Sequence, residues 1–320
     1  MHRLKVLITG ISGFIGRSLV EEIVNSNLPW KVHGIDVKEP VFNKQEYRKH
    51  IVFSKVDIRD KSEVKAFFAK NQFDGVIHLA AISRVLDAEN DKDNCIATNL
   101  NGTKYVIESV ANKPETWFVF GSSREVYGEQ NLFPVKESAE KRPINIYGEC
   151  KLKGELLVKE LIRKYAILRF SNVYGNNYDI EGRVIPAFVR RAKNDEPLYL
   201  EGGNQIIDFT FVSDTVTSII RTADLLQNKK IQAEEIHISP GIGNRITDII
   251  ACLEQELGKK LDVQIREKRS YDVQRFVGDP SKRKAILDNS DFVTLSQGIQ
   301  LYLKSSEEIK HLTTNNSIHR

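Results

Sequence analysis

A glycine-rich turn between an apolar strand and a helix, close to the N-terminus, constrains this chain more than any other feature. The apolar run Val6–Ile8 enters the segment Gly10–Gly16, and helical spacing of apolar residues begins there. Glycines allow a tight turn and the close approach of a diphosphate, while a helix N-terminus offers free N–H groups and a partial positive charge. The turn therefore predicts a dinucleotide site, at which we expect Gly10, Gly13, Phe14, Ile15 and Gly16.

Short apolar runs alternate with helical stretches over the first 120 residues. The expected strands are Lys5–Thr9, Lys31–Asp36, Ile51–Lys55, Gly75–Leu79 and Thr116–Phe120. The expected helices between them are Phe14–Asn25, Lys61–Lys70 and Asn99–Ala111. Strands that are apolar on both faces and alternate with helices form covered parallel sheets. The pattern predicts an α/β fold of the Rossmann type, with a doubly wound parallel sheet.

The rhythm changes after Asn172, where Gly, Asn, Pro and Tyr become dense through Gly203. Helices are again expected over Asp214–Leu226 and Ile246–Leu257. We expect a smaller C-terminal α/β part that binds substrate over the same cleft. The expected division is a dinucleotide-binding domain over 1–172, to which 205–235 return, a substrate-binding part over 173–204 and 236–304, and a polar tail over 305–320.

Composition excludes several classes of protein. The 320 residues can bury a sizeable core, and 47 Lys and Arg are interspersed with 43 Asp and Glu, which argues against nucleic-acid binding. No apolar run reaches about 18 residues, so we expect no membrane segment. Cys95, Cys150 and Cys252 form no CxxC pair. This pattern predicts a reducing, cytoplasmic location and no metal site.

Two carboxylates follow the second and third expected strands. Asp36 stands twenty residues after Gly16, where a carboxylate can accept both ribose hydroxyls and would repel a 2′-phosphate, so NAD is favoured over NADP. Asp57, followed by Ile58, could accept from the adenine amino group. The alternative is that both aspartates merely begin turns.

A tyrosine and a lysine four residues apart are the candidates for chemistry. Tyr147 and Lys151 begin a helix for which Asn145 is the expected cap, and their spacing places both side chains on one face. An ammonium beside a phenol favours the phenolate and lowers its pKa, which would create a general base. Ser123, at the carboxyl end of another strand, could hydrogen-bond the reacting oxygen.

The chain resembles the extended short-chain dehydrogenase/reductase family, specifically its NAD-dependent nucleotide-sugar epimerases and dehydratases. The resemblance covers residues 4 to 300 and rests on motifs that occur in the family's order. They are Thr9-Gly10 through Gly16, His78-Leu79-Ala80-Ala81, Asn99 with Gly102-Thr103, Ser122-Ser123 with Val126-Tyr127-Gly128, Tyr147-Gly148 with Lys151, Arg169-Phe170 with Asn172-Val173-Tyr174-Gly175, and Asp208-Phe209 with Val212 and Asp214.

The resemblance implies roles for individual residues. Tyr147 would be the catalytic base, Lys151 would hold the nicotinamide ribose and tune the tyrosine, and Ser123 would hydrogen-bond the substrate. Asn172 would contact the substrate. Leu79, Ala80, Ala81 and Asn99 would lie at the cofactor. The resemblance also implies a homodimer, formed as a four-helix bundle by the helices at Asn99–Ala111 and Tyr147–Lys164.

Two adjacent residues leave the choice of reaction open. In the resemblance, 4,6-dehydratases and UDP-glucuronate decarboxylases carry Glu at the position of Glu125, whereas common 4-epimerases carry a small residue. Dehydratases also carry a preceding Asp as proton donor, but here it is Arg124, which cannot donate a proton at neutral pH. Alternatively, Glu125 and Arg124 pair with each other or with neighbours at the cleft rim.

The substrate's diphosphate lacks one expected partner. The family usually has Arg directly before Asp208-Phe209, and this chain has Ile207. A bidentate phosphate contact is therefore missing unless another cation replaces it. Arg269 resembles the family's second diphosphate arginine. The other candidate cations are Arg183, Arg190, Arg191, Lys193 and Arg275.

The sequence thus predicts an enzyme that oxidises C4 of a nucleotide-diphosphate sugar and acts as a UDP-sugar 4-epimerase or as a dehydratase that uses Glu125. It leaves three further possibilities open: a UDP-glucuronate decarboxylase-like enzyme, a simple NAD(P)H-dependent sugar reductase, and a non-catalytic NAD-binding scaffold.

Overall fold

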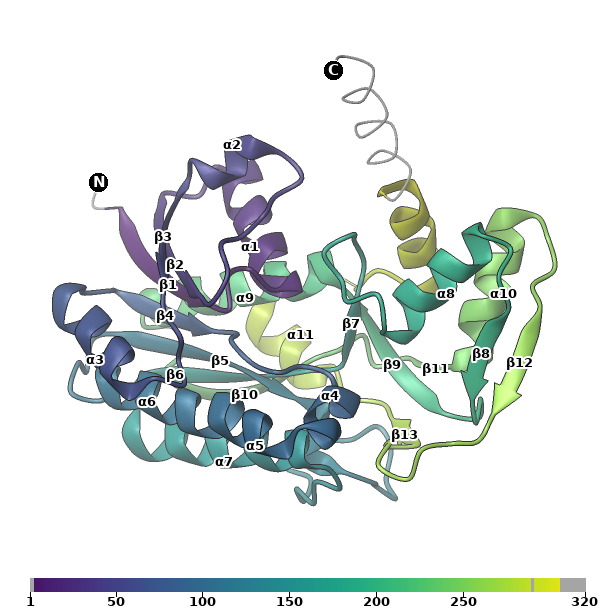
Figure 1. Cartoon of the computed structure of the whole chain (residues 1–320). Coiled ribbons are helices and arrows are strands. Elements are labelled where there is room, and N and C mark those ends of the chain that lie inside the picture. Colours follow the sequence, from purple (N-terminus) through teal and green to yellow (C-terminus); the bar gives the residue numbers. More distant parts are fainter. Residues whose placement is uncertain (1–2, 289–290, 306–320) are drawn as a thin grey trace, which may run out of the picture.

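The computed structural model describes residues 3–288 and 291–305. Its centre is a seven-stranded parallel sheet, drawn edge-on in Figure 1. In spatial order the strands are β3 (Ile51–Lys55), β2 (Trp30–Asp36), β1 (Leu4–Thr9), β4 (Gly75–His78), β5 (Trp117–Ser123), β6 (Tyr165–Phe170) and β10 (Ala233–Ile238). The order reverses between β1 and β4, which places a ligand crevice at the carboxyl ends of these strands. The predicted α/β parallel fold is confirmed.

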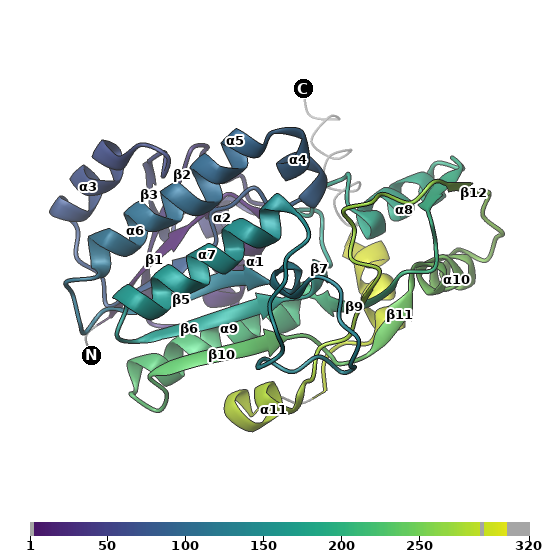
Figure 2. The same ribbon diagram turned by 90° about the horizontal axis from the view of Figure 1, so that it is seen from below.

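Helices cover both faces of this sheet (Figures 1 and 2). One face carries α1 (Phe14–Asn25), α9 (Val212–Gln227) and α11 (Ser281–Leu287), and the short α2 (Gln45–Arg48) lies beside α1. The other face carries α3 (Lys61–Lys70), α6 (Thr103–Val110) and α7 (Ile146–Leu161). Each face has its own buried apolar cluster. The strands are therefore apolar on both sides, as the sequence predicts.

One predicted helix has a different geometry. Where the periodicity predicts a single helix over Asn99–Ala111, the chain runs through α4 (Val85–Asn90), α5 (Lys92–Cys95) and the π-helical segment η1 (Ile96–Gly102) before α6 begins. π-Helical turns are rare and frequent at functional sites. Here the turn places the Asn99 side chain against the backbone of Ile82, which follows β4.

The C-terminal residues supply a second, smaller body. Its larger sheet contains β7 (Asn172–Tyr174), β9 (Ile206–Phe211), β11 (Gly243–Arg245) and β13 (Arg275–Phe276), and a separate parallel pair contains β8 (Leu198–Glu201) and β12 (Val263–Arg266). The helices α8 (Val184–Lys193), α10 (Ile246–Leu257) and a helix over 295–305 pack around these strands on a third apolar cluster. Figure 1 shows β8 and β12 at the end of this body that lies farthest from the large sheet.

The chain passes between the two bodies more than once. β9 belongs to the small sheet, the following α9 packs on α1, and β10 completes the large sheet as far as Ile238. The division at residues 172, 205 and 236 stays a prediction, and of the predicted tail only Ser305 lies within the described residues. Among those residues no helix is both long and apolar enough to cross a membrane.

Candidate active site

A cavity of about 970 Å³ lies at the carboxyl ends of the large-sheet strands and continues into the smaller body. Most of the residues that the sequence analysis named for cofactor, catalysis or substrate line it. The exceptions are Asn99 and three of the candidate diphosphate cations, Arg190, Lys193 and Arg275. The sequence analysis therefore brought together side chains from both bodies, including Arg183 and Arg269, that lie far from the glycine turn in sequence.

The glycine turn leaves room for a ligand where a side chain would intrude. Gly10 has a φ of +70°, and a Cβ there would come within 2.6 Å of the Ala80 nitrogen. Gly13 is the N-cap of α1 and has no side-chain cap. A Cβ on Gly13 would meet only the Gly10 oxygen and would otherwise fill the cavity. The first N–H groups of α1 have no intrahelical partner and face this space, so the turn fits the diphosphate of a dinucleotide.

The two predicted nucleoside carboxylates differ in their surroundings. Asp36 accepts hydrogen bonds from the Ser12 and Val37 N–H groups, at 3.0 and 2.8 Å, which ties the end of β2 to the glycine turn. Asp57 is held by Arg59, whose Nε lies 3.0 Å from the carboxylate, and these bonds lower the Asp57 pKa. Any bond from adenine to Asp57 therefore competes with Arg59. The neighbouring Ile58 also lines the cavity.

Asn99 does not line the cavity, and the prediction that it lies at the cofactor stays a prediction. Its side chain is 0% exposed and does not line the cavity. It accepts from the Ile82 N–H at 2.8 Å and donates to the Ile82 carbonyl at 2.9 Å. These two bonds fix the segment that follows Leu79, Ala80 and Ala81, which do line the cavity. The contribution of Asn99 is to position that wall.

The predicted catalytic group is assembled on α7 and β5. Asn145 caps α7 by accepting from the Gly148 N–H at 2.8 Å. Ser123, at the end of β5, hydrogen-bonds Tyr147. Lys151 is 3% exposed and donates to the Gly121 carbonyl at 2.7 Å. The helix cap and the strand end therefore bring the three predicted side chains to one point of the cavity.

The electrostatics of Tyr147 differ from the sequence-based expectation. Burial raises the pKa of Tyr147 to about 12, while the Ser123 hydrogen bond and the charge of Arg183 oppose the rise. Lys151 is not among the groups that lower it: its Nζ lies 5.9 Å from the tyrosine ring centre, and burial lowers the pKa of Lys151 itself to about 8. The largest contributions that favour the phenolate are thus those of Ser123 and Arg183.

Arg124 and Glu125 form an ion pair, which is the alternative that the sequence left open. An Arg124 guanidinium nitrogen lies 2.9 Å from Glu125 Oε1, and both side chains are buried. Glu125 Oε2 accepts from the Asn145 amide at 2.8 Å. The Arg124 Nε donates to Asn172 Oδ1 at 2.8 Å. Both oxygens of Glu125 are therefore engaged, and Asn172 is oriented by Arg124.

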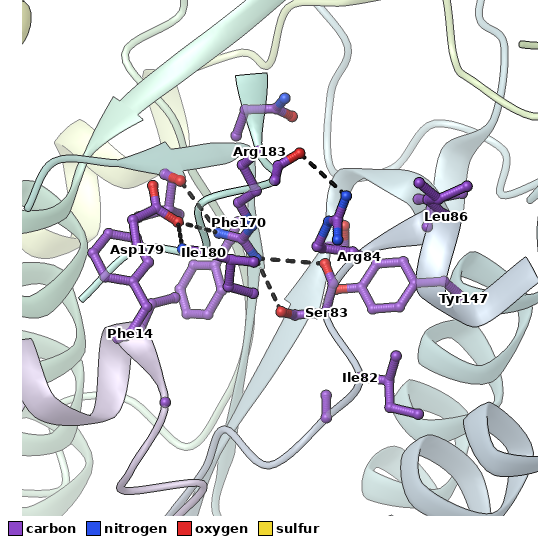
Figure 3. Close-up of a pocket in the computed structure, with 18 of the residues that line it drawn as sticks. Phe14, Ile82, Ser83, Arg84, Leu86, Tyr147, Phe170, Asp179, Ile180 and Arg183 are labelled. Atoms are coloured by element: carbon purple, nitrogen blue, oxygen red, sulfur yellow. Dashed lines mark hydrogen bonds and ion pairs between the residues drawn. The ribbon is translucent and has the colours of Figure 1, made fainter. Parts of the chain in front are cut away.

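A second arginine reaches the catalytic end of the cavity from the segment after β7. Figure 3 shows Arg183 between Asp179 and Ser83, with Tyr147 nearby. Arg183 donates to Ser83 Oγ at 3.0 Å, and Arg84 donates to the Gly182 carbonyl at 3.1 Å. Arg183 thus lies near Tyr147 (Figure 3), whereas the sequence analysis includes it among candidates for the diphosphate. Ser83 and Arg84 were missed, although their place directly after the motif His78–Ala81 was a usable signal.

The opposite end of the cavity has no cation at position 207, as the sequence indicates. Ile207 is 3% exposed and packs in the apolar cluster of the smaller body. Arg269 lines the cavity but is paired with Asp272 and Glu201, at 2.7 and 2.9 Å. Among the described residues, no group of three or more His, Cys, Asp or Glu could hold a metal ion.

Comparison with known families agrees with this geometry. Residues 6–236, more than half of the chain, match the NAD dependent epimerase/dehydratase family. The chain belongs to this family. NAD is therefore the cofactor, as Asp36 predicted, and the protein is an NAD-dependent enzyme of the epimerase class.

Individual members of the NAD dependent epimerase/dehydratase family match nearly the whole chain. A protein of Methanocaldococcus jannaschii that carries the provisional name UDP-glucose 4-epimerase is 30% identical over 292 residues, which are 88% of this chain and 92% of the relative. The UDP-glucose 4-epimerase of Thermotoga maritima, solved with UDP-glucose, has a TM-score of 0.86 at 25% identity and covers 95% of this chain and 99% of its own. The UDP-glucuronic acid 4-epimerase of Bacillus cereus, solved with UDP-glucuronic acid and NAD, has a TM-score of 0.84 at 27% identity and covers 97% and 100%.

Proposed function

We propose that this protein is a UDP-sugar 4-epimerase, an isomerase, and not a dehydratase. The observation that carries the choice is the state of Glu125. Its two oxygens are held by Arg124 and Asn145, and the residue before it cannot donate a proton. Removal of the C5 proton and departure of the C6 hydroxyl need a free base and an acid, and these two residues provide neither. The names of the relatives support a UDP-sugar as substrate.

The chain's own residues supply binding, orientation and proton transfer. Bound NAD would supply reversible hydride transfer at C4 of the sugar. Tyr147 takes the C4 hydroxyl proton as a general base, with Ser123 hydrogen-bonded to the reacting oxygen. The charge of Arg183 favours the phenolate that this step requires. Tyr147 then returns the proton when C4 is reduced on its opposite face.

The remaining polar groups hold the sugar while the opposite face of its C4 is presented for reduction. Asn172 is oriented by Arg124 and presents its amide to the cavity. Glu125 anchors Asn145, and Asn145 caps the helix that carries Tyr147. In this proposal Glu125 is a positioning residue that acts through the N-terminus of α7. This role differs from that of the reactive carboxylate which the resemblance suggests at position 125.

The test is the Glu125→Gln variant assayed in deuterated water. Glutamine retains one acceptor oxygen, which Asn145 or Arg124 can use, and loses the second. Because a positioning role needs no reactive carboxylate, C4 inversion should continue within about tenfold of the wild-type rate, with unchanged NAD content. Neither protein should place deuterium at C5. A wild-type enzyme that exchanges C5 hydrogen and a variant that stops at the 4-keto sugar would establish the dehydratase instead. Loss of carbon dioxide from a UDP-uronic acid would establish a decarboxylase.

A sugar reductase and a non-catalytic scaffold would each give a distinct outcome in the same assay. The reductase would consume added NADH stoichiometrically with product. The scaffold would hold NAD and turn over no sugar. Retention of Ser123, Tyr147 and Lys151 around one point of the cavity supports epimerisation over both.

We also propose the homodimer that the resemblance implies. η1, α6 and α7 pack side by side on one face of the sheet (Figure 2), and Leu156 on α7 is 56% exposed. A second copy would cover this leucine in a four-helix arrangement. Sedimentation velocity should give a dimer for the wild type and a monomer for Leu156→Glu, and a monomeric wild type would refute the proposal.

A further inference from the structure

The end of the cavity opposite the catalytic residues contains a pair of cations of which the sequence analysis named only Arg191. Tyr199 on β8 lines the cavity there, and two guanidinium groups lie over its ring. The Arg266 guanidinium carbon is 3.4 Å from the ring centre and that of Arg191 is 4.4 Å away. Arg266 ends β12 and Arg191 belongs to α8, so the three side chains come from three elements.

We infer that Arg266 and Arg191, stacked on Tyr199, hold the diphosphate of the nucleotide sugar in place of the arginine absent at position 207. This inference rests on the proposed function, because it assumes that the substrate carries a nucleoside diphosphate. It identifies Arg266, which no sequence motif singled out, as a substrate-binding residue.

The first argument is that the ring organises the two arginines. An aromatic face attracts a guanidinium by about 0.5–2 kcal/mol, and a stacked guanidinium has its N–H edges in fixed directions. Without the ring, two guanidinium groups would repel each other and extend into solvent. Tyr199 therefore keeps two cations together beside a cavity, and this is the condition under which a doubly charged anion is bound well.

The second argument is the difference in their partners. Arg191 has protein partners, since it donates to the Pro197 carbonyl at 3.1 Å and lies 3.5 Å from Glu196. The Arg266 side chain has neither a hydrogen bond nor an ion pair within residues 3–288 and 291–305. Arg269, the third arginine at this end, is already shared by Glu201 and Asp272. Arg266 is exposed, so of these three arginines it is the one whose donors face solvent and are open to an anion.

The third argument is location. Tyr147 and Tyr199 line the same cavity, one on the large-sheet side and one in the smaller body. A nucleotide sugar whose C4 lies at Tyr147 extends its diphosphate away from Tyr147 along this cavity. Ile207 and Phe209 of β9 form an apolar wall there, so Arg266 and Arg191 supply cationic donors that this strand does not.

The test is binding of UDP to the NAD-containing enzyme by isothermal titration calorimetry at low and moderate salt. Arg266→Gln should weaken UDP binding about tenfold to a hundredfold and reduce its salt dependence, and Arg191→Gln should have a smaller effect. Tyr199→Leu should approach the Arg266→Gln result, whereas Tyr199→Phe keeps the ring and should bind like the wild type. Arg221→Gln removes an exposed arginine outside the cavity and is the control for net charge.

Catalytic constants separate this role from a general loss of structure. Arg266→Gln should raise KM for the UDP-sugar by a similar factor and change kcat less than about threefold, with NAD content unchanged. Equal UDP affinity in Arg266→Gln and wild type, or no measurable UDP binding by the wild type, would overturn the inference. If UDP binding depends on Arg266 but no sugar is inverted at C4, the proposed function fails and the diphosphate site stands.

Discussion

The cofactor half of the cleft and its substrate half are built from different kinds of sequence. The cofactor half is made by backbone: β1, the glycine turn and α1 follow one another within residues 4–25, and the ligand meets N–H groups and glycine surfaces. The substrate half is made by side chains that come from α8, β8, β12 and the segment after it. These short segments are dispersed along the C-terminal half of the chain.

The difference determines how each half tolerates change. A backbone cradle fails when a single Cβ is added, so its sequence pattern is strict and readable. A side-chain site can lose one cation and obtain another from a different element, and its pattern is then lost while its chemistry persists. Position 207 is such a case, because it carries Ile in place of the expected arginine, and Arg266 and Arg191, stacked on Tyr199, supply the cations.

The largest effect is expected at the point where the two halves meet. Tyr147→Phe removes the general base and should lower kcat by about 10² to 10⁴-fold, with NAD content and UDP affinity unchanged. Steady-state kinetics with a UDP-sugar, together with the absorbance of the bound cofactor, measure this. Tyr165→Phe, at the start of β6, is the control. Full activity of Tyr147→Phe would show that another residue is the base.

The cofactor half should lose its ability to bind NAD when one methyl group is added to the glycine turn. Gly10→Ala forces a Cβ to within 2.6 Å of the Ala80 nitrogen and also imposes a positive φ. We expect loss of co-purified NAD and a fall in the free energy of unfolding of more than about 1 kcal/mol. Gly258→Ala has a similar φ of +64° but meets nothing within 4 Å, so it should cost only the backbone strain and keep NAD. Equal behaviour of the two variants would remove the evidence for a backbone cradle.

A smaller effect is expected behind the wall of the cofactor half. Asn99→Ala leaves the Ile82 N–H and carbonyl groups without partners, which should cost about 1–3 kcal/mol of stability. Because the Ala80–Ile82 segment would then be less well held, NAD should dissociate faster. Urea unfolding and the rate of NAD release into a scavenging dehydrogenase measure the two effects. Unchanged release in a destabilised variant would limit Asn99 to a structural role.

A further effect, on stability and its pH dependence rather than on activity, concerns the junction of the two bodies. Asp208 on β9 accepts from the Gly241 and Gly278 N–H groups, at 3.1 and 3.2 Å, and burial raises its pKa to about 7. In the folded protein the Asp208 carboxyl therefore keeps a proton that it releases near pH 4 in the unfolded chain. This group consequently contributes less to the free energy of unfolding as the pH rises from about 4 to about 7. The free energy of unfolding of the wild type, relative to Asp208→Asn, should fall over that range. Chemical unfolding at about pH 5, 6 and 7 measures it, and a constant difference would contradict the shift.

The fold of the cofactor half followed from sequence because local rules agree there. The expected helices Phe14–Asn25 and Lys61–Lys70 have the bounds of α1 and α3, and the first five expected strands match within a few residues. The π-helical turn at Ile96–Gly102 was missed because its geometry depends on the tertiary bonds of Asn99 and leaves no regular apolar period. β8 and β12 were not predicted either, since strands of four residues in a loop-rich stretch produce little periodic signal. α8 was also missed, although the helical spacing of Ile185, Phe188, Val189 and Ala192 was a usable signal.

The candidate site divides in the same way. Strand ends and a helix cap predicted that Ser123, Tyr147 and Lys151 would meet, because those positions follow from topology. The partners of individual charges did not follow. That Lys151 bonds the Gly121 carbonyl and Arg183 approaches Tyr147 depends on side-chain conformations in a packed site. No spacing rule connects Arg266 with Tyr199, because the two residues meet across two parallel strands that are distant in sequence.

The most direct test of the account is NMR of the product formed by the wild-type enzyme from a panel of UDP-sugars in deuterated water. The account predicts a product inverted at C4, with hydrogen retained at both C4 and C5 and with no added NAD or NADH consumed. A 4-keto-6-deoxy sugar that carries deuterium at C5 would contradict it.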